Sequence, residues 1–339
     1  MPSRALSTSS EASAAWRVQW AKREFYFEGR MDETVGCNSK SERRLQLLSS
    51  RLLKLSSARS MAKPIPPQVQ LEETYNAAAD SYDLPPLSFW DRFGRRTVDR
   101  MPLSPGMTVL DVCCGIGGSG IPAAERVGPT GWVVAVDLAE NLLRKGSHRA
   151  AQRGLGNIEF RRADLENLPF ADEAFDAVIC VFGIFFVPDL HGAVRGLWRL
   201  VRPSGALAIT IWGPNPFQPA DGIFWEAVKR EDPELHSSIK SWSKIVEPEP
   251  LRALLVECGI SDPKIVTEPG THPLVSPEDW WTILLGSGYR STINALSPER
   301  RERVRLANLE GVNRSQIREL RADVIYAIAL RPARLTTGF

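Results

Sequence analysis

Short apolar segments alternate with helical patterns in the middle of this 339-residue chain, and that alternation restricts the fold more than any other feature. Five strand-like segments, each bounded by turn residues, cover residues 107–112, 132–137, 158–163, 175–181 and 206–212. Strands that alternate with helices build a parallel sheet with helices on both faces. The pattern therefore predicts an α/β, doubly wound fold.

Further elements are predicted on both sides of this region. Residues 71–82 and 89–101 read as helices ahead of the first strand. After the fifth strand we expect helices at 222–230 and 250–259, a strand at 264–267, helical segments over 277–314 and a last strand at 322–330. The late helical segments interrupt what would otherwise be a terminal hairpin, so they are expected to form a cap.

The composition allows a large buried core. The chain has 42 Lys+Arg, 40 Asp+Glu and 43% hydrophobic residues, which excludes a disordered chain or one steered to nucleic acid by bulk charge. Residues 1–60 are unlike the rest, because they hold 11 basic and 6 acidic side chains. Five cysteines without a CxxC pair suit a reducing compartment, and neither a structural disulfide nor a metal site is expected.

A glycine-rich loop follows the first predicted strand. The segment DVCCGIGGSG at residues 111–120 lies between that strand and a helical segment at 121–127. Glycines let the backbone turn sharply and approach a ligand, and the amide groups at a helix start face that ligand. A tight turn without a ligand is the alternative for such a loop taken alone.

Carboxylates end three successive strands of the predicted sheet. Asp111 ends the first strand, Asp137 the second and Asp164 the third. The carboxyl ends of adjacent parallel strands share one crevice, so the three side chains are expected to converge on one ligand. Taken singly, each would be a turn or helix-capping residue.

The loop and Asp137 alone fit either a nicotinamide dinucleotide or S-adenosylmethionine, since a strand-end carboxylate accepts hydrogen bonds from ribose hydroxyls in both cases. Asp111 favours the second cofactor, because a carboxylate repels a pyrophosphate and attracts a cationic ammonium or sulfonium group. Asp164 adds a further carboxylate at the same edge. Both cofactors remain open at this point.

Five ordered motifs resemble those of class I S-adenosylmethionine-dependent methyltransferases, and the subgroup that the chain resembles most is the ubiquinone/menaquinone-biosynthesis type. The motifs are VLDVCCGIG at 109–117, GWVVAVDL at 131–138, GNIEFRRAD at 156–164, FDAVIC at 175–180 and LVRPSG at 200–205. The resemblance implies a Rossmann-like methyltransferase fold with a mostly parallel seven-stranded sheet and a helical cap inserted before the last strand. It also implies S-adenosyl-L-methionine as the cofactor.

The resemblance assigns one group of residues to the methionine end of this cofactor. Asp111 and the loop with Gly115 and Gly117 would hold that end, while Tyr75 and Tyr82 match the N-terminal helix that closes over the cofactor in relatives. Packing on an amphipathic helix explains the two tyrosines equally well without the resemblance.

A second group is implied to bind the nucleoside end. Asp137 and Leu138 would contact the ribose and one adenine face, Asp164 the adenine amino group, and Leu165 the ring. Cys113 departs from the family pattern, which often has glycine there, and is interpreted as a structural residue.

The acceptor is expected to be an apolar or aromatic small molecule. Aromatic side chains follow the predicted strand ends and occur in the cap, at 182–188, Trp212, Phe217, Phe224, Trp225, Trp280 and Trp281. The fourth strand ends CVFG at 180–183 and lacks the Asn/Asp-Pro-Pro-aromatic element of nucleic-acid amino methyltransferases, so no nucleic-acid partner is expected. No catalytic residue is assigned, although His272 ahead of the cap is the first histidine to test as a base.

Five regions are expected along the chain. Residues 1–62 are a basic leader predicted to be disordered, and organellar targeting is not favoured because acidic residues precede its basic helix. We expect the N-terminal helices at 63–102, the cofactor-binding core at 103–215, the acceptor-side helices, cap and terminal strands at 216–332, and a tail at 333–339.

The predicted function is methyl transfer from S-adenosylmethionine to a quinone-like, aromatic or isoprenoid-type metabolite in the cytoplasm. A nicotinamide-dependent oxidoreductase and a non-catalytic cofactor-binding protein on the same fold are the alternatives. No segment of the sequence is long and apolar enough to span a membrane.

Overall fold

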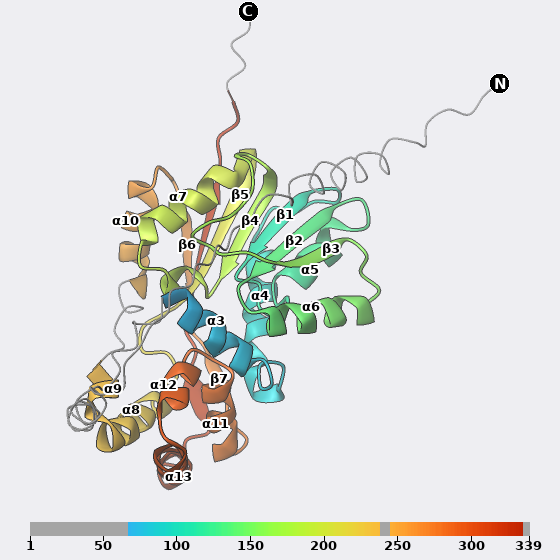
Figure 1. Cartoon of the computed structure of the whole chain (residues 1–339). Coiled ribbons are helices and arrows are strands. Elements are labelled where there is room, and N and C mark those ends of the chain that lie inside the picture. Colours follow the sequence, from blue (N-terminus) through green and yellow to red (C-terminus); the bar gives the residue numbers. More distant parts are fainter. Residues whose placement is uncertain (1–66, 238–244, 335–339) are drawn as a thin grey trace, which may run out of the picture. The chain divides into compact units, whose positions relative to one another are not determined.

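The computed structural model describes residues 67–237 and 245–334, which lie in one compact unit (Figure 1). The predicted leader at 1–62 and its helix lie outside the described residues. The sheet has seven strands in the order β3-β2-β1-β4-β5-β9-β6. Their bounds are β1 Thr108–Val112, β2 Trp132–Asp137, β3 Ile158–Arg162, β4 Phe175–Val181, β5 Val201–Trp212, β6 Lys264–Glu268 and β9 Val324–Leu330.

The strands are parallel except β9, which runs antiparallel to both β5 and β6. Strand β1 lies inside the sheet between β2 and β4, and its residues Val109, Leu110 and Val112 are at most 1% exposed because helices cover both faces of the sheet. The prediction of a doubly wound, mostly parallel seven-stranded sheet is therefore confirmed.

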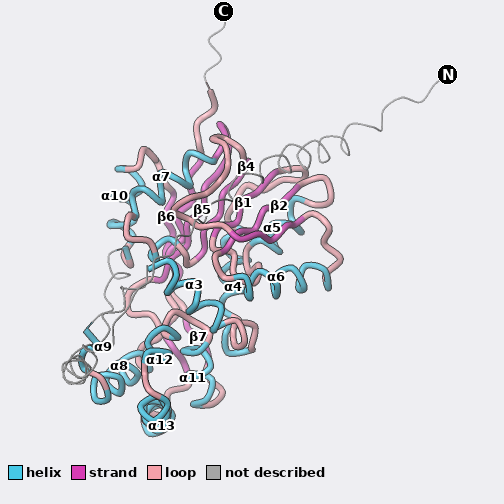
Figure 2. Tube along the Cα trace, in the orientation of Figure 1, coloured by secondary structure: helices cyan, strands magenta, loops and turns pink. Residues whose placement is uncertain are grey.

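Two groups of helices cover the sheet (Figures 1 and 2). Helices α4 and α5 pack against one face through a cluster that includes Val98, Ala123, Val127 and Val133. Helix α7 packs against β4 and β5, and α10 packs against α7 and β6. The bounds are α3 Pro67–Ala78, α4 Phe89–Asp99, α5 Gly120–Val127, α6 Glu140–Gln152, α7 Leu190–Leu200 and α10 Pro248–Glu257.

The predicted cap lies between β6 and β9 in the chain. It consists of α11 Pro277–Leu285, α12 Arg290–Ala295 and α13 Pro298–Arg314, and α13 packs against α8 Ala220–Glu231, which is followed by the short α9 Pro233–Ser237. A capping box of Ser276 and Asp279 begins α11, and Ser297 caps α13. The insertion of a helical cap before the last strand is confirmed.

Two details of the fold differ from the sequence predictions. Strand β5 begins at Val201 rather than at residue 206, and a register shift against β4 accommodates the turn-forming residues Pro203 and Gly205. A small second sheet pairs β7 Thr271–Pro273 with β8 Glu319–Arg321 across the base of the cap. Strands of three residues carry too little periodicity to be recognised in a sequence.

None of the described helices combines the length and the apolar composition that a membrane-spanning segment needs.

Candidate cofactor and acceptor site

The loop after β1 has the conformation that its glycines predict. Gly115 and Gly117 have φ of 54° and 85°, and a Cβ on Gly117 would lie 3.0 Å from Ile121 and Phe160. Cys113 has φ of 59°, a left-handed conformation that glycine adopts more easily, which explains why glycine is usual here in the resembling family.

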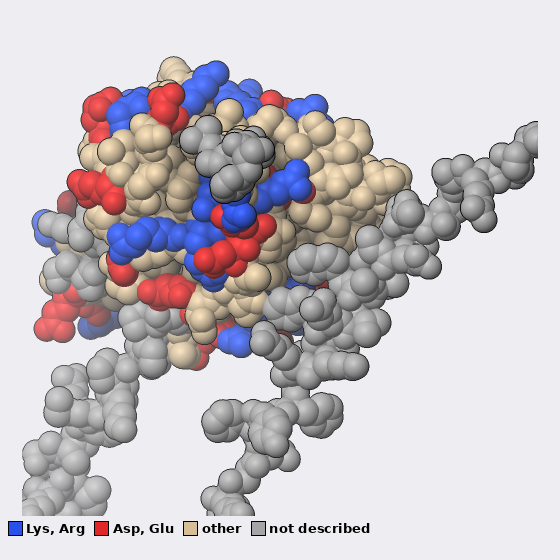
Figure 3. Space-filling view, turned by 90° about the horizontal axis from the view of Figure 1, so that it is seen from above, with Lys and Arg blue, Asp and Glu red and all other residues tan. Residues whose placement is uncertain are grey.

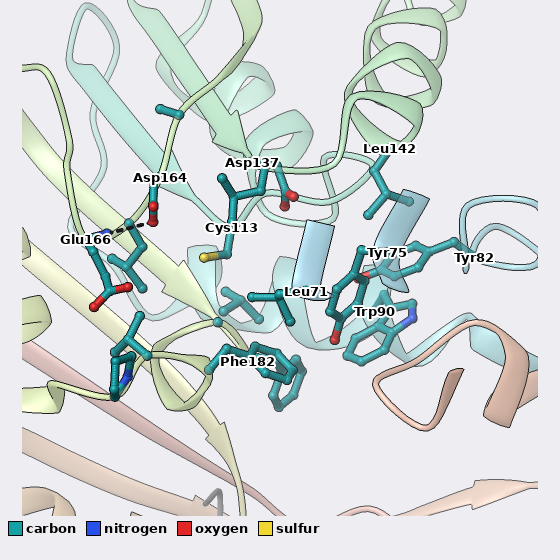
Figure 4. A pocket seen from close by; sticks show the side chains of 18 residues that line it. Leu71, Tyr75, Tyr82, Trp90, Cys113, Asp137, Leu142, Asp164, Glu166 and Phe182 are labelled. Carbon is teal, nitrogen blue, oxygen red and sulfur yellow. Dashed lines mark hydrogen bonds between the residues drawn. The ribbon is translucent and has the colours of Figure 1, made fainter. Parts of the chain in front are cut away.

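Asp137 at the end of β2 connects this loop to the second strand. Its Oδ2 accepts a hydrogen bond from the Gly115 amide at 2.9 Å, and its Oδ1 accepts one from the Ala139 amide at 3.0 Å. Burial raises the pKa of the Asp137 carboxyl, although these backbone amides oppose that effect. The carboxylate lies beside Tyr75 and Leu142 in the close-up of the cavity (Figure 4).

Asp111 is enclosed below the loop. The side chain is fully buried, and its two oxygens lie 2.8 and 3.0 Å from the Ser119 hydroxyl, which donates to them. Burial raises the pKa of the Asp111 carboxyl to about 7. Asp111 does not line the cavity described next, so any effect on a ligand there acts through the loop or through space.

A cavity of about 80 Å³ opens at the carboxyl edge of β1, β2 and β3 (Figure 4). The residues of the predicted cofactor site that line it are Tyr75, Tyr82, Asp137, Leu138, Asp164 and Leu165. Gly115 and Gly117 lie outside its lining, as Asp111 does. The Asp164 carboxylate accepts a hydrogen bond from the Glu166 amide at 3.0 Å. This bond stabilises the turn after β3 at the edge of the cavity.

Aromatic rings from α3, from the turn that follows it and from α4 close one side of this cavity. Helix α3 ends at Ala78, so the expectation that Tyr82 lies on the same helix as Tyr75 is wrong. Tyr82 stacks on Trp90 with ring centroids 5.3 Å apart and planes at 7°, and the Tyr75 ring lies 6.3 Å from Tyr82. Burial raises the pKa of both tyrosines, so their hydroxyls stay protonated. Trp90, Cys113 and Glu166 also line the cavity. No motif marks Trp90 or Glu166, whereas Cys113 lies in the first motif and was interpreted as a structural residue.

A second cavity of about 410 Å³ adjoins the first. Its aromatic lining is Tyr75, Trp90, Phe182, Phe185, Phe186, Trp212, Phe217, Trp225 and Tyr289. The two cavities share the lining residues Leu71, Tyr75, Trp90, Phe182 and Phe186. A ligand in the first cavity and a ligand in the second would therefore contact the same five residues.

Three of the aromatic residues expected in the acceptor lining are absent from it, and two of them belong to the core. Phe224 and Trp280 are fully buried, and Trp281 is also absent from the lining of either cavity. The Trp280 Nε1 donates to the Asn308 Oδ1 at 3.1 Å, which fixes α11 against α13.

His272 does not have the surroundings of a catalytic base. It is 3% exposed, lies outside both cavities, and its Nε2 is 2.8 Å from the Pro86 carbonyl oxygen. Burial lowers the pKa of its ring, which therefore donates to Pro86 as a neutral side chain. The choice of His272 as the first base to test is wrong, and this histidine supports the η1 turn Pro85–Leu87.

Comparison with known proteins confirms the resemblance to S-adenosylmethionine-dependent methyltransferases that the five motifs indicate. Residues 69–213 match the model of the ubiE/COQ5 methyltransferase family. This stretch includes β1 to β5 and every residue of the predicted cofactor site.

Two curated relatives illustrate the match. The chain is 38% identical to nocamycin O-methyltransferase of Saccharothrix syringae over 42% of its own length and 50% of that protein. It is 37% identical to demethylmenaquinone methyltransferase of Listeria monocytogenes serotype 4a (strain HCC23) over 34% of its length and 49% of that enzyme. The chain thus spans about half the length of the first curated relatives that it matches.

One solved structure shows the same fold over a larger part of the chain. Haemonchus contortus phosphoethanolamine N-methyltransferase 2, in complex with S-adenosyl-L-methionine, aligns with a TM-score of 0.50 and 15% identity. The alignment covers 80% of this chain and 61% of that protein.

Proposed function

We propose that this protein transfers a methyl group from S-adenosylmethionine to an apolar small molecule. The observation that carries the proposal is a pair of neighbouring cavities that share part of their lining, one at the strand-end carboxylates and one lined by aromatic rings. The shared wall at Tyr75, Trp90 and Phe182 is where the two reactants would meet.

The residues of the first cavity fit a cationic nucleoside cofactor. Asp137 and Asp164 offer carboxylate oxygens for ribose hydroxyls and an adenine amino group, while Leu138 and Leu165 offer apolar contact to the adenine ring. Glycine at position 115 lets Tyr82 pack directly on the loop, since a Cβ on Gly115 would lie 3.2 Å from the Tyr82 Oη. Asp111 contributes negative charge below this loop.

S-adenosylmethionine supplies a methyl group already activated by its sulfonium. The protein therefore has to align the acceptor and exclude water, and both tasks suit an aromatic cavity adjoining the cofactor cavity. The described lining of the second cavity, where the acceptor would lie, contains no His, Lys, Asp or Glu to act as a base. Alignment and desolvation thus account for most of the proposed rate enhancement.

The acceptor we propose is a quinone-like, aromatic or isoprenoid-type metabolite. The volume and the aromatic lining of the second cavity support a ring system, and the names of the two curated relatives above support an apolar acceptor. One face of the molecule carries Lys, Arg, Asp and Glu side chains close together (Figure 3), a mixed pattern unlike a phosphate-binding surface. A cytoplasmic location stays a prediction.

Calorimetric titration of the full chain with S-adenosylhomocysteine and with NADH tests the choice of cofactor. We expect S-adenosylhomocysteine to bind with a stoichiometry near one and NADH not to bind, because the Asp111 carboxylate disfavours a pyrophosphate in this crevice. Binding of NADH alone would instead support the oxidoreductase alternative and refute the proposal.

A further inference from the structure

The lining of the second, aromatic cavity contains a tyrosine bound to a carboxylate. Tyr289, just before α12, lines the cavity, and its Oη donates to the Asp221 Oδ1 at 2.6 Å. The Trp225 Nε1 donates to the same oxygen at 2.9 Å, and the Gln218 Nε2 donates to Oδ2 at 3.2 Å. The carboxylate therefore receives three hydrogen bonds from side chains.

The Tyr289–Asp221 pair differs from the rest of the cavity lining in its chemistry. The described residues that line the aromatic cavity include no Asp, Glu, His, Lys or Arg, and their ionisable side chains are Tyr75 and Tyr289. Tyr75 lies at the wall shared with the cofactor cavity, whereas Tyr289 lies against Phe224, Trp225 and Trp280, with ring centroids between 5.3 and 5.9 Å away. Tyr289 is thus the one hydroxyl of this lining that a carboxylate holds.

The direction of the hydrogen bonds determines what the cavity can offer to a ligand. A tyrosine hydroxyl has one hydrogen, and that of Tyr289 is directed to Asp221, so toward a ligand its oxygen can only accept. The Thr292 hydroxyl of this lining has no hydrogen-bond partner among the described residues. Three other lining hydroxyls follow the same rule as Tyr289, because each donates to a backbone carbonyl of its own segment. These bonds are Thr74 to Gln70, Ser287 to Ile283 and Ser291 to Gly288.

We propose that the Tyr289–Asp221 pair is a positioning site that accepts a hydrogen bond from a hydroxyl group of the acceptor, and so selects hydroxylated ring systems. This inference rests on the proposed function, since it concerns the acceptor cavity of the same site. Burial raises the pKa of Asp221 and of Tyr289, and hydrogen bonds in such a low-dielectric site are stronger than in water.

A structural role is the competing explanation. Asp221 belongs to the first turn of α8 and Tyr289 precedes α12, so their bond also joins the cap to α8. If the pair only stabilised the cap, removing it would weaken the binding of all ligands of the cavity alike. A positioning role discriminates between a ligand with a hydroxyl hydrogen and one of similar shape without it.

The test compares two probes on the full chain saturated with S-adenosylhomocysteine. The probes are 2-naphthol and 2-fluoronaphthalene, and their dissociation constants are measured by quenching of tryptophan fluorescence. Tyr289→Phe is expected to weaken the binding of 2-naphthol about three- to tenfold, the range for one neutral hydrogen bond, and to leave the dissociation constant of 2-fluoronaphthalene unchanged. Asp221→Asn should act in the same direction, because it removes the charged partner of the hydroxyl.

Tyr326→Phe is the matched control, because it removes a buried tyrosine hydroxyl from β9, outside the lining of both cavities. It should change neither dissociation constant. Equal weakening of both probes by Tyr289→Phe, or no change in either, would overturn the inference while S-adenosylhomocysteine binding upholds the cofactor site. Failure of the wild-type chain to bind S-adenosylhomocysteine would count against the proposed function itself.

Discussion

Asp137 is the residue at which the loop after β1 and the cofactor cavity meet. Its carboxylate orders the loop through Gly115 and also lines the cavity. We predict that Asp137→Ala weakens the binding of S-adenosylhomocysteine about 10- to 100-fold, because hydrogen bonds from ribose hydroxyls to a charged group are lost. Calorimetry measures the affinity, and circular dichroism checks that the fold is retained.

Asp172→Ala provides the control for this prediction, because that carboxylate is 73% exposed and lies outside both cavities. It should bind S-adenosylhomocysteine as the wild type does. If Asp137→Ala also binds with unchanged affinity, the assignment of Asp137 to the ribose is wrong.

Asp111 predicts a pH dependence of cofactor binding. Its pKa of about 7 means that it is largely protonated at pH 6 and ionised at pH 8. Only the ionised form attracts an ammonium group, so the affinity for S-adenosylhomocysteine should rise about tenfold from pH 6 to pH 8. Asp111→Asn should abolish this rise, and titrations at the two pH values measure it. A wild-type affinity that does not change with pH would contradict a role for this charge.

As the pH rises, Asp111 changes the folding stability in the direction opposite to that of a salt-bridged carboxylate. Because the pKa of Asp111 is raised in the folded state, the native protein holds a proton that the unfolded chain releases near pH 4. This contribution to stability is present at low pH and is lost as the pH rises from about 4 to about 7.

Some site residues could be read from the sequence and others could not. Asp137 and Asp164 are recognisable because strand ends in a parallel sheet converge, whatever the details of packing. Trp90 and Tyr289 could not be assigned, because they reach the cavities through the packing of helices that are distant in sequence. His272 was misjudged for the same reason, since only packing brings the Pro86 carbonyl to its ring.

Among the elements, the cap depends on the contact between α11 and α13. Trp280 is fully buried, and its Nε1 bonds to Asn308, which is also fully buried. Trp280→Phe should lower the free energy of unfolding by about 2 kcal/mol, because it leaves a small cavity and removes the donor to a buried amide. Urea unfolding measures this loss.

The neighbouring tryptophan on the same helix is the comparison. Trp281 is only partly buried and lines neither cavity, so Trp281→Phe should change the free energy of unfolding by less than about 0.5 kcal/mol. Equal losses in the two variants would show that the Asn308 bond contributes nothing specific to the cap.

Element types were predictable to different degrees. The five core strands and the cap helices have clear periodicity, and the structure contains each of them. The start of β5 was not predictable, because Pro203 and Gly205 usually end strands, whereas a register shift against β4 carries the strand through them. The β7–β8 pair depends on long-range contact that no local pattern records.

For the whole molecule, the described residues by themselves form a lining for both cavities. The lining residues extend from Gln70 to Ala295. A chain that starts at Met61 should therefore bind S-adenosylhomocysteine within about twofold of the full chain, as calorimetry would measure. A soluble truncated chain that does not bind would show that residues 1–60 contribute to the site.

Methyl transfer is proposed to occur where the two cavities meet. The most direct test incubates the full chain with S-adenosylmethionine labelled in its methyl group and a metabolite extract, and then measures the label in the organic phase. We predict enzyme-dependent label in an apolar, ring-containing product, and loss of that label with Asp137→Ala. Tight binding of the cofactor with no label in any product of a broad extract would contradict the claim and favour a non-catalytic protein.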